Sequence, residues 1–184
     1  MYGLVNKAIA DLISMEHGEA VWAEVRRRAG VDVEVFVGMD PYPDAVTYDL
    51  VRAASELLDV PAEKLLEAFG EHWILYTARQ GYGDLLGMGG RTFREFMLHL
   101  HDLHTHVGLA FPNLTPPSFW CSDVGDDTLT LHYQSQRDGL APMVVGLLRG
   151  LGRMFDTEVT IEHVRRRAAG ADHDQFAIGF RPRS

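Results

Sequence analysis

The sequence predicts an α+β protein in which an N-terminal helical part packs on a C-terminal antiparallel sheet. Two observations lead to this fold class. Apolar residues recur at the spacing of a helix face over most of residues 4–108, whereas they alternate with polar residues in three later segments. Helices therefore come first and strands mostly last, which is typical of an α+β arrangement.

The helical part opens with four segments in which apolar residues follow the helical period. Gly30 suits the end of the second segment, and Pro61 suits the first turn of the fourth. Residues 35–44 are rich in turn formers and predict a loop, and the glycines of residues 81–90 predict irregular structure. The four segments are residues 4–15, 19–30, 45–60 and 61–78.

A fifth helix is predicted over residues 92–108. Thr92 is followed three residues later by Glu95, which is the pattern of a capping box at a helix start. Gly108 suits the end of this helix. The proline-rich residues 112–117 then predict a turn.

The C-terminal part is predicted to be mainly strands. Residues 128–136 alternate with a period of two, as one strand does, and residues 140–155 return to the helical period. Residues 158–164 and 174–180 alternate again on either side of a turn-rich stretch, so they predict two antiparallel strands.

Composition favours a single soluble domain spanning residues 1–184, because 46% of the residues are hydrophobic and 23% are charged. The net charge of −9 argues against nucleic acid or an anionic membrane as a partner, and no apolar run approaches the length of a membrane span. The basic runs 26–28 and 165–167 are interpreted as a solvated helix face or strand end. Cys121 is the lone cysteine, so an intrachain disulfide is excluded, and we interpret it as a packed strand residue. Because the absence of disulfides suits a reducing compartment, we expect a cytoplasmic location.

Four histidines lie in the helix predicted over residues 92–108: His99, His101, His104 and His106. A helix turns by about 100° per residue, so the apolar residues of this segment form one stripe along it. His104 falls inside that stripe and the other three histidines fall outside it. One histidine of the four should therefore point into the protein.

The orientation of these histidines argues against zinc, which usually needs three or four converging ligands. His101 and His104 could share one metal, but no HExxH or paired-cysteine pattern completes a set. A lone inward histidine is normally a satisfied core residue, and it is also what a haem needs on one side of its iron. The residues alone leave these two interpretations open.

Residues 129–137, read as a strand, have a face that turns from apolar to polar, since alternate side chains share a face. A phenol, a hydroxyl and a guanidinium in line suit the edge of a dianionic ligand such as the two propionates of haem. The alternative is a half-exposed strand whose end meets water. The residues of this face are Leu129, Leu131, Tyr133, Ser135 and Arg137.

The motif Tyr133-x-Ser135-x-Arg137, downstream of an inward histidine, resembles the haem nitric oxide/oxygen-binding (H-NOX) family. This family includes the sensor domain of soluble guanylate cyclase and small bacterial stand-alone proteins. The resemblance covers essentially the whole chain and is closest to cyanobacterial-type members. The segments that carry it are "MYGLVNKAI", "LHDLHTHVGLAFP", "TPPSF" and "HYQSQRDGLAPMVVGLL".

The resemblance implies a haem b held between the helical part and the sheet. His104 would be the proximal ligand of the haem iron, and Tyr133, Ser135 and Arg137 would bind the propionates. Pro117 would press on the porphyrin and bend it, with Pro116 as the other candidate.

Three further points of the resemblance concern the gas. Family members that bind dioxygen have a distal tyrosine on the helix after the propionate motif, and Met143 stands at the equivalent position here. Val5, Trp73 and Leu147 would line the same apolar pocket, although the indole of Trp73 is a potential donor. Bound dioxygen needs a hydrogen-bond donor more than nitric oxide does, so nitric oxide is the expected ligand, with carbon monoxide as an adventitious one.

The resemblance also implies a function without catalysis. The chain would be a gas sensor that signals by conformational change to a separate partner, such as a histidine kinase or a cyclic-di-GMP enzyme. The alternatives are passive carriage of haem or gas and a haem peroxidase. A peroxidase needs a distal acid–base pair, for which His72, expected at the surface, is the nearby candidate. Tyr2 is a candidate for contact with a propionate, with turn or core packing as its alternative.

Overall fold

The computed structural model describes residues 1–77, 87, 89–110 and 115–183, and it confirms the α+β fold class. The predicted helical segments before residue 78 are present with slightly different ends. Gly30, with a φ of 67°, ends the second helix as expected. These helices are α1 (Gly3–His17), α2 (Glu19–Ala29), α3 (Asp44–Leu58) and α4 (Ala62–His72).

The chain does not leave α4 as a regular helix, because residues Trp73–Thr77 form a π-helical turn, η1. Such turns are rare and recur at functional sites. Helical periodicity had predicted an ordinary helix for these residues. The stretch predicted to be irregular, residues 81–90, falls largely outside the described residues.

Helix α6 (Phe93–Ala110) begins where the capping pattern predicted. The Thr92 hydroxyl accepts a hydrogen bond from the Glu95 backbone N–H at 3.1 Å, and the Glu95 carboxylate accepts one from the Arg91 N–H at 2.8 Å. The reciprocal bond of the capping box thus goes to Arg91 rather than to Thr92. The predicted end at Gly108 was wrong, because the helix continues through this glycine.

The described strands form one antiparallel sheet with the order β1-β2-β4-β3. The strand predicted over residues 128–136 ends earlier, at Gln134, and the two predicted final strands pair with each other. Alternation had not marked residues 118–122 as a strand, although Cys121 had been interpreted as a packed strand residue. The strands are β1 (Ser118–Ser122), β2 (Thr128–Gln134), β3 (Thr157–Arg165) and β4 (Asp174–Pro182), with α7 (Ala141–Met154) between β2 and β3.

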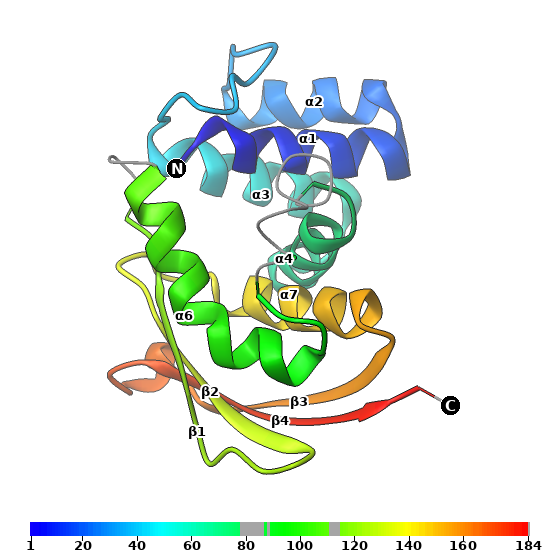
Figure 1. Ribbon diagram of the computed structural model, residues 1–184. Helices are drawn as coiled ribbons and strands as arrows, with labels where there is room; N and C mark the ends of the chain where they lie inside the picture. The colour runs from blue at the N-terminus through cyan, green and yellow to red at the C-terminus, as the bar shows by residue number, and fades with distance from the viewer. Residues whose placement is uncertain (78–86, 88, 111–114, 184) are drawn as a thin grey trace.

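Figure 1 shows α1 and α2 farthest from the sheet, with α7 lying against the sheet and α6 along one side. Two apolar cores result. One fills the space among α6, α7 and the inner face of the sheet, and the other lies among α1, α2, α3 and α4. Trp73 packs against both cores, so the π-helical turn stands at their boundary.

Helices α4 and α7 approach so closely that glycines are required at their contact. A Cβ on Gly146 would collide with the Glu67 carbonyl, and a Cβ on Gly70 would collide with the Met143 carbonyl. Main chain therefore packs on main chain here, which sets the position of the α7 face that carries Met143.

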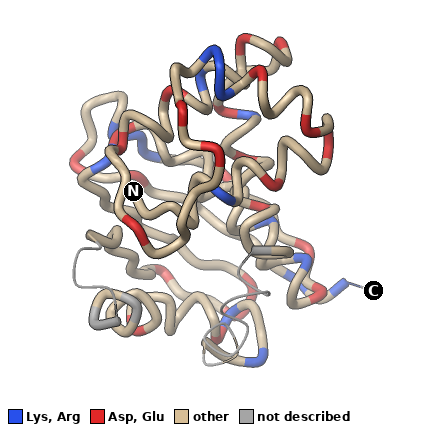
Figure 2. The backbone as a smooth tube through the Cα atoms, turned by 90° about the horizontal axis from the view of Figure 1, so that it is seen from above, with Lys and Arg blue, Asp and Glu red and all other residues tan. Residues whose placement is uncertain are grey.

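Acidic and basic residues are interspersed along the backbone in Figure 2. The described helices include none with the length and apolar character needed to cross a membrane.

Candidate functional site

A cavity of about 330 Å³ lies between the two cores. Its walls come from α1, η1, α6, β1, β2 and α7, and most of the lining is apolar. The volume is within the range of pockets that hold small molecules and cofactors, roughly 300–1,000 Å³. The structure brings all the predicted site residues to this cavity: Tyr2, Val5, Trp73, His104, Pro117, Tyr133, Ser135, Arg137, Met143 and Leu147.

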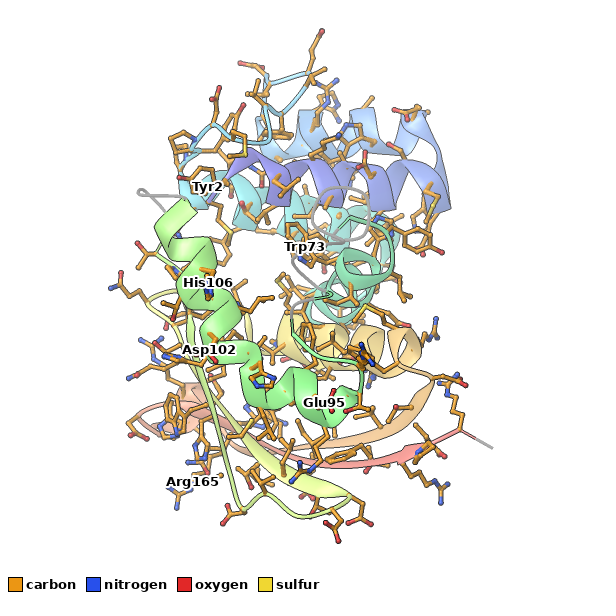
Figure 3. The ribbon with its side chains drawn as sticks, viewed as in Figure 1. Tyr2, Trp73, Glu95, Asp102, His106 and Arg165 are labelled. Carbon is orange, nitrogen blue, oxygen red and sulfur yellow. The ribbon has the colours of Figure 1, made fainter. Side chains whose placement is uncertain are left out.

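His104 is the one histidine of α6 that lines the cavity, whereas His99, His101 and His106 are exposed. Phe93, Phe96, Met97 and Leu100 form the buried stripe of the same helix. The angular position of His104 in that stripe explains its direction. Figure 3 shows His106 and Asp102 on the outward face of α6.

The tautomer of neutral His104 follows from one hydrogen bond. Its Nδ1 lies 2.9 Å from the Leu100 carbonyl oxygen, which can only accept, so Nδ1 carries a proton and in the neutral ring Nε2 keeps its lone pair. Burial lowers the pKa of His104, and this effect outweighs the opposing effect of the Leu100 hydrogen bond. A neutral imidazole with a free Nε2 is the form that binds a transition metal.

Phe119 of β1 lies beside His104. The rings of His104 and Phe119 have centroids 4.8 Å apart, and Phe119 packs in turn on Tyr133 at 5.2 Å. Pro116 and Pro117, which precede Phe119 in the chain, line the same cavity. Phe119 belongs to the "TPPSF" segment, but the sequence alone had assigned it no contact.

The polar end of the cavity is built on the end of β2. Tyr133 is buried in the strand, whereas Ser135 and Arg137 lie beyond it in a turn, so the predicted single strand face is interrupted at Gln134. The Ser135 hydroxyl accepts a hydrogen bond from the Arg137 backbone N–H at 3.0 Å. Burial raises the pKa of Tyr133, which therefore remains a neutral phenol and hydrogen-bond donor.

Arg137 is held by groups from elsewhere in the chain. Its Nε donates to Asp44 of α3 at 2.8 Å, and its Nη1 donates to the Thr115 carbonyl at 3.0 Å. Within the described residues Nη2 has no partner, so one nitrogen of a guanidinium that lines the cavity is available to an anion. Asp44 was not singled out from the sequence, because no local sequence pattern indicates its contact with Arg137, which lies 93 residues away in the chain.

The apolar part of the lining carries the residues predicted for the gas side. Met143 and Leu147 come from α7, Val5 from α1 and Trp73 from η1. Figure 3 shows Trp73 at a level between α1 and α7. Among the described lining residues His104 is the sole imidazole, and there is no carboxylate.

Two other reactive groups lie away from the cavity. The prediction that His72 is at the surface was wrong, since it is buried, stacks on Tyr76 and is absent from the described lining. Cys121 is a packed strand residue, as predicted: burial raises the pKa of its thiol to about 11, and the thiol donates weakly to the Met97 carbonyl. Neither residue provides an acid–base pair at the site.

Tyr2 precedes α1 and pairs with Pro41 in an isolated bridge. The carbonyls of Asp40 and Gly38 accept hydrogen bonds from the first N–H groups of α1, at 2.8 Å from Gly3 and 3.0 Å from Leu4. The predicted loop 35–44 therefore satisfies the start of α1 and closes this side of the cavity.

Comparison with known proteins identifies the family of the chain. The sequence profile described as Haem-NO-binding matches residues 2–163. The chain belongs to the haem-NO-binding family. The resemblance inferred from the sequence is thereby confirmed.

The relatives of this haem-NO-binding chain include much longer proteins. It is 33% identical over 163 residues to soluble guanylate cyclase gcy-31 of Caenorhabditis elegans, covering 88% of this chain and 23% of that protein. It is 30% identical over 171 residues to gcy-33 of the same organism, covering 92% of this chain and 18% of that protein. The chain thus spans about a quarter or less of the length of these relatives.

Solved structures share the fold of this haem-NO-binding chain at lower sequence identity. An H-NOX protein from S. oneidensis in the Fe(II)NO state superposes with a TM-score of 0.90 at 22% identity, covering 98% of this chain and 99% of that one. A point mutant of an H-NOX protein from K. algicida, in the unliganded Fe(II) state, gives 0.83 at 20% identity, covering 98% and 97%.

The donor set at the cavity fits the group that the family name implies. A haem needs an imidazole lone pair for its iron, donors for its carboxylates and apolar walls for its ring. His104 Nε2, the Arg137 guanidinium with the Tyr133 and Ser135 hydroxyls, and the apolar residues between them supply these three in one cavity.

Proposed function

We propose that residues 1–184 form a single haem-binding sensor domain that takes up nitric oxide and signals to a separate partner protein without catalysis of its own. The observation that carries this proposal is the neutral His104, whose Nδ1–H donates to the Leu100 carbonyl in a mostly apolar cavity. A ferrous haem b would supply the iron to which the gas binds. We propose a cytoplasmic location for the domain, as the lone cysteine suggests.

His104 would ligate the iron through Nε2, and its hydrogen bond to Leu100 would hold the ring in that orientation. Tyr133, Ser135 and Arg137 would bind the propionates, and Tyr2, which lines the same cavity, would be a further contact of a propionate. Pro117 is the residue we propose to press on the ring plane.

Met143, Leu147, Val5 and Trp73 would form the pocket for the gas. The described residues of α7 that line the cavity carry no hydrogen-bond donor in their side chains. This supports nitric oxide over dioxygen, because a partly charged bound dioxygen needs a donor, and it leaves carbon monoxide as an adventitious ligand.

A signal requires that the gas favour one of two conformations of the protein. The two walls of the cavity come from different helices: His104 is on α6, which packs on β1, and Met143 is on α7, which packs on α4 and on β3. The proposed change is a shift between these walls, read by a histidine kinase or a cyclic-di-GMP enzyme.

The test of the proposal is an absorption spectrum of the reduced protein, with and without nitric oxide, followed by partner binding in both states. We expect a five-coordinate ferrous haem that binds nitric oxide and a partner affinity that differs between the states. Equal partner affinity in both states would indicate a passive carrier, and turnover of hydrogen peroxide would indicate a peroxidase.

A further inference from the structure

The second basic run of the sequence is not uniformly solvated. Strand β3 ends at Arg165, and Arg167 begins a short 3₁₀ turn, η2 (Arg167–Ala169). Its Nη1 donates to the Ser135 carbonyl at 2.6 Å and lies 2.9 Å from the Asp138 carboxylate. The guanidinium of Arg167 thus reaches the turn that carries Ser135 and Arg137.

Arg167 is itself held in place from β4. Its backbone N–H donates to Asp174 at 3.1 Å, and His163 lies 2.8 Å from the same carboxylate oxygen. Asp174 is 7% exposed, and it is the register partner of Tyr133 on β2. A buried acid that is bonded from two sides gives the start of η2 a defined position.

The turn that Arg167 contacts has little support from the sheet. Strand β2 ends at Gln134, so the ladder does not extend to residues 135–138. From the helical side, Asp44 binds the Arg137 guanidinium, and the Tyr48 hydroxyl donates to the Asp138 carbonyl at 2.9 Å. Arg167 provides the corresponding support from the sheet side.

We propose that Arg167 is a positioning residue for the carboxylate-binding turn of Ser135 and Arg137, an inference that rests on the proposed function. Its bond to the Ser135 carbonyl, a charge-assisted one, is the working contact. The pair with Asp138 adds little, because that carboxylate is 85% exposed and screened by water. Arg167 acts through the turn and does not line the cavity.

The experiment measures how fast the holoprotein transfers its haem to an excess of apomyoglobin. It is run in parallel with protein that carries haem dimethyl ester, in which both carboxylates are blocked. Arg167→Gln should speed the loss of haem by roughly threefold to tenfold, as expected when one charge-assisted hydrogen bond no longer orders a clamp. It should leave the loss of the dimethyl ester unchanged, because no clamp holds that ligand.

Arg165→Gln is the matched control, since the side chain of this exposed arginine of the same run makes no polar contact with the described residues and lies at the periphery in Figure 3. Asp138→Asn should also behave as the wild type. Arg167→Lys keeps the charge but not the planar guanidinium donor, so this variant should lose haem faster than the wild type. It tests the inference even if Arg167→Gln fails to fold.

Equal acceleration for haem and its dimethyl ester would show a merely structural role and overturn the inference. Wild-type rates in both Arg167→Gln and Arg167→Lys would overturn it as well. A wild-type protein that loses the two ligands at the same rate would instead contradict the proposed carboxylate clamp, and the role of Arg167 would fall with it.

Discussion

Arg137 and Asp44 join the two parts of the fold, with 2.8 Å between Arg137 Nε and Asp44 Oδ2. Asp44 lies in the first turn of α3, and its second carboxylate oxygen contacts the amino group of Met1. Arg137 follows β2 and lines the cavity. This ion pair therefore connects the helical part to the polar end of the site.

This ion pair predicts acid sensitivity. Burial acts to raise the pKa of Asp44, but hydrogen bonds from the Met1 amino group and from Arg137 outweigh it, so the pKa is lowered. A carboxyl with a lowered pKa in the folded state stabilises the protein above its unfolded pKa, about 4, and loses this contribution as the pH falls further. Asp44→Asn should reduce the free energy of unfolding by ~1 kcal/mol at pH 7, since the pair is partly exposed.

The difference between Asp44→Asn and the wild type should shrink between pH 4.5 and pH 3 (roughly the range in which an aspartate titrates), as measured by chemical denaturation. Asp49→Asn is the matched control, because Asp49 pairs with Arg52 on the exposed surface of the same helix. A difference that stays constant on acidification would contradict the stabilising role of the charged pair.

His104, the histidine of α6 that lines the cavity, gives a second prediction. His104→Ala should abolish normal haem retention or leave haem that added imidazole restores to a five-coordinate spectrum, because we propose Nε2 of His104 as the iron ligand. His106→Ala is a close control, since His106 Nδ1 makes the same bond to a carbonyl four residues earlier, on the exposed face. His99→Ala and His101→Ala should also retain haem; loss of the iron–histidine bond in His101→Ala would refute the assignment.

Gas selectivity is the third prediction. The ferrous protein should form no stable dioxygen complex in air. Met143→Tyr should raise dioxygen affinity on the order of 10- to 100-fold, the effect of one hydrogen bond to a partly charged acceptor, provided that the phenol points at the gas. Stopped-flow absorption would measure this. A long-lived dioxygen complex in the unmodified protein that disappears on Trp73→Phe would make the indole the donor instead.

The fourth prediction concerns the contact of α4 with α7. Gly146→Ala places a methyl group against the Glu67 carbonyl and should reduce the free energy of unfolding by roughly 3 kcal/mol, the upper range for overpacking. For a chain of this size the melting temperature should fall by about 6–12 °C. Gly108→Ala, whose nearest neighbour would be Pro116 at 3.7 Å, should be neutral or slightly stabilising in a calorimetric scan.

Much of this architecture follows from local patterns. The capping residues Thr92 and Glu95 located the start of α6, and helical periodicity separated His104 from its three neighbours. Alternation located β2, β3 and β4. These features were predictable because each depends on residues a few positions apart. The limits of β1 and β2 depend instead on the pairing of the two strands with each other, so the local patterns missed β1 as a strand and the early end of β2.

The contacts around the polar end of the site could not be predicted in the same way. The bonds from Asp44 to Arg137 and from Arg167 to Ser135 join residues far apart in the sequence. The π-helical turn at Trp73 has no distinctive composition, since its backbone bonding depends on the packing of two cores. The prediction at Gly108 failed because a glycine ends a helix when the chain turns left-handed, and here the helical conformation simply continues.

The glycine contact between α4 and α7 also bears on how this protein could evolve. Where the backbones of α4 and α7 touch, no side chain can change rotamer to move the two helices apart. The backbone that carries Met143 and Leu147 is therefore fixed in position. The volume and polarity of the pocket for a diatomic gas then depend on the ends of a few side chains that line it. A lineage could change its preferred gas by single substitutions of those side chains while the backbone contact of α4 with α7 stays the same.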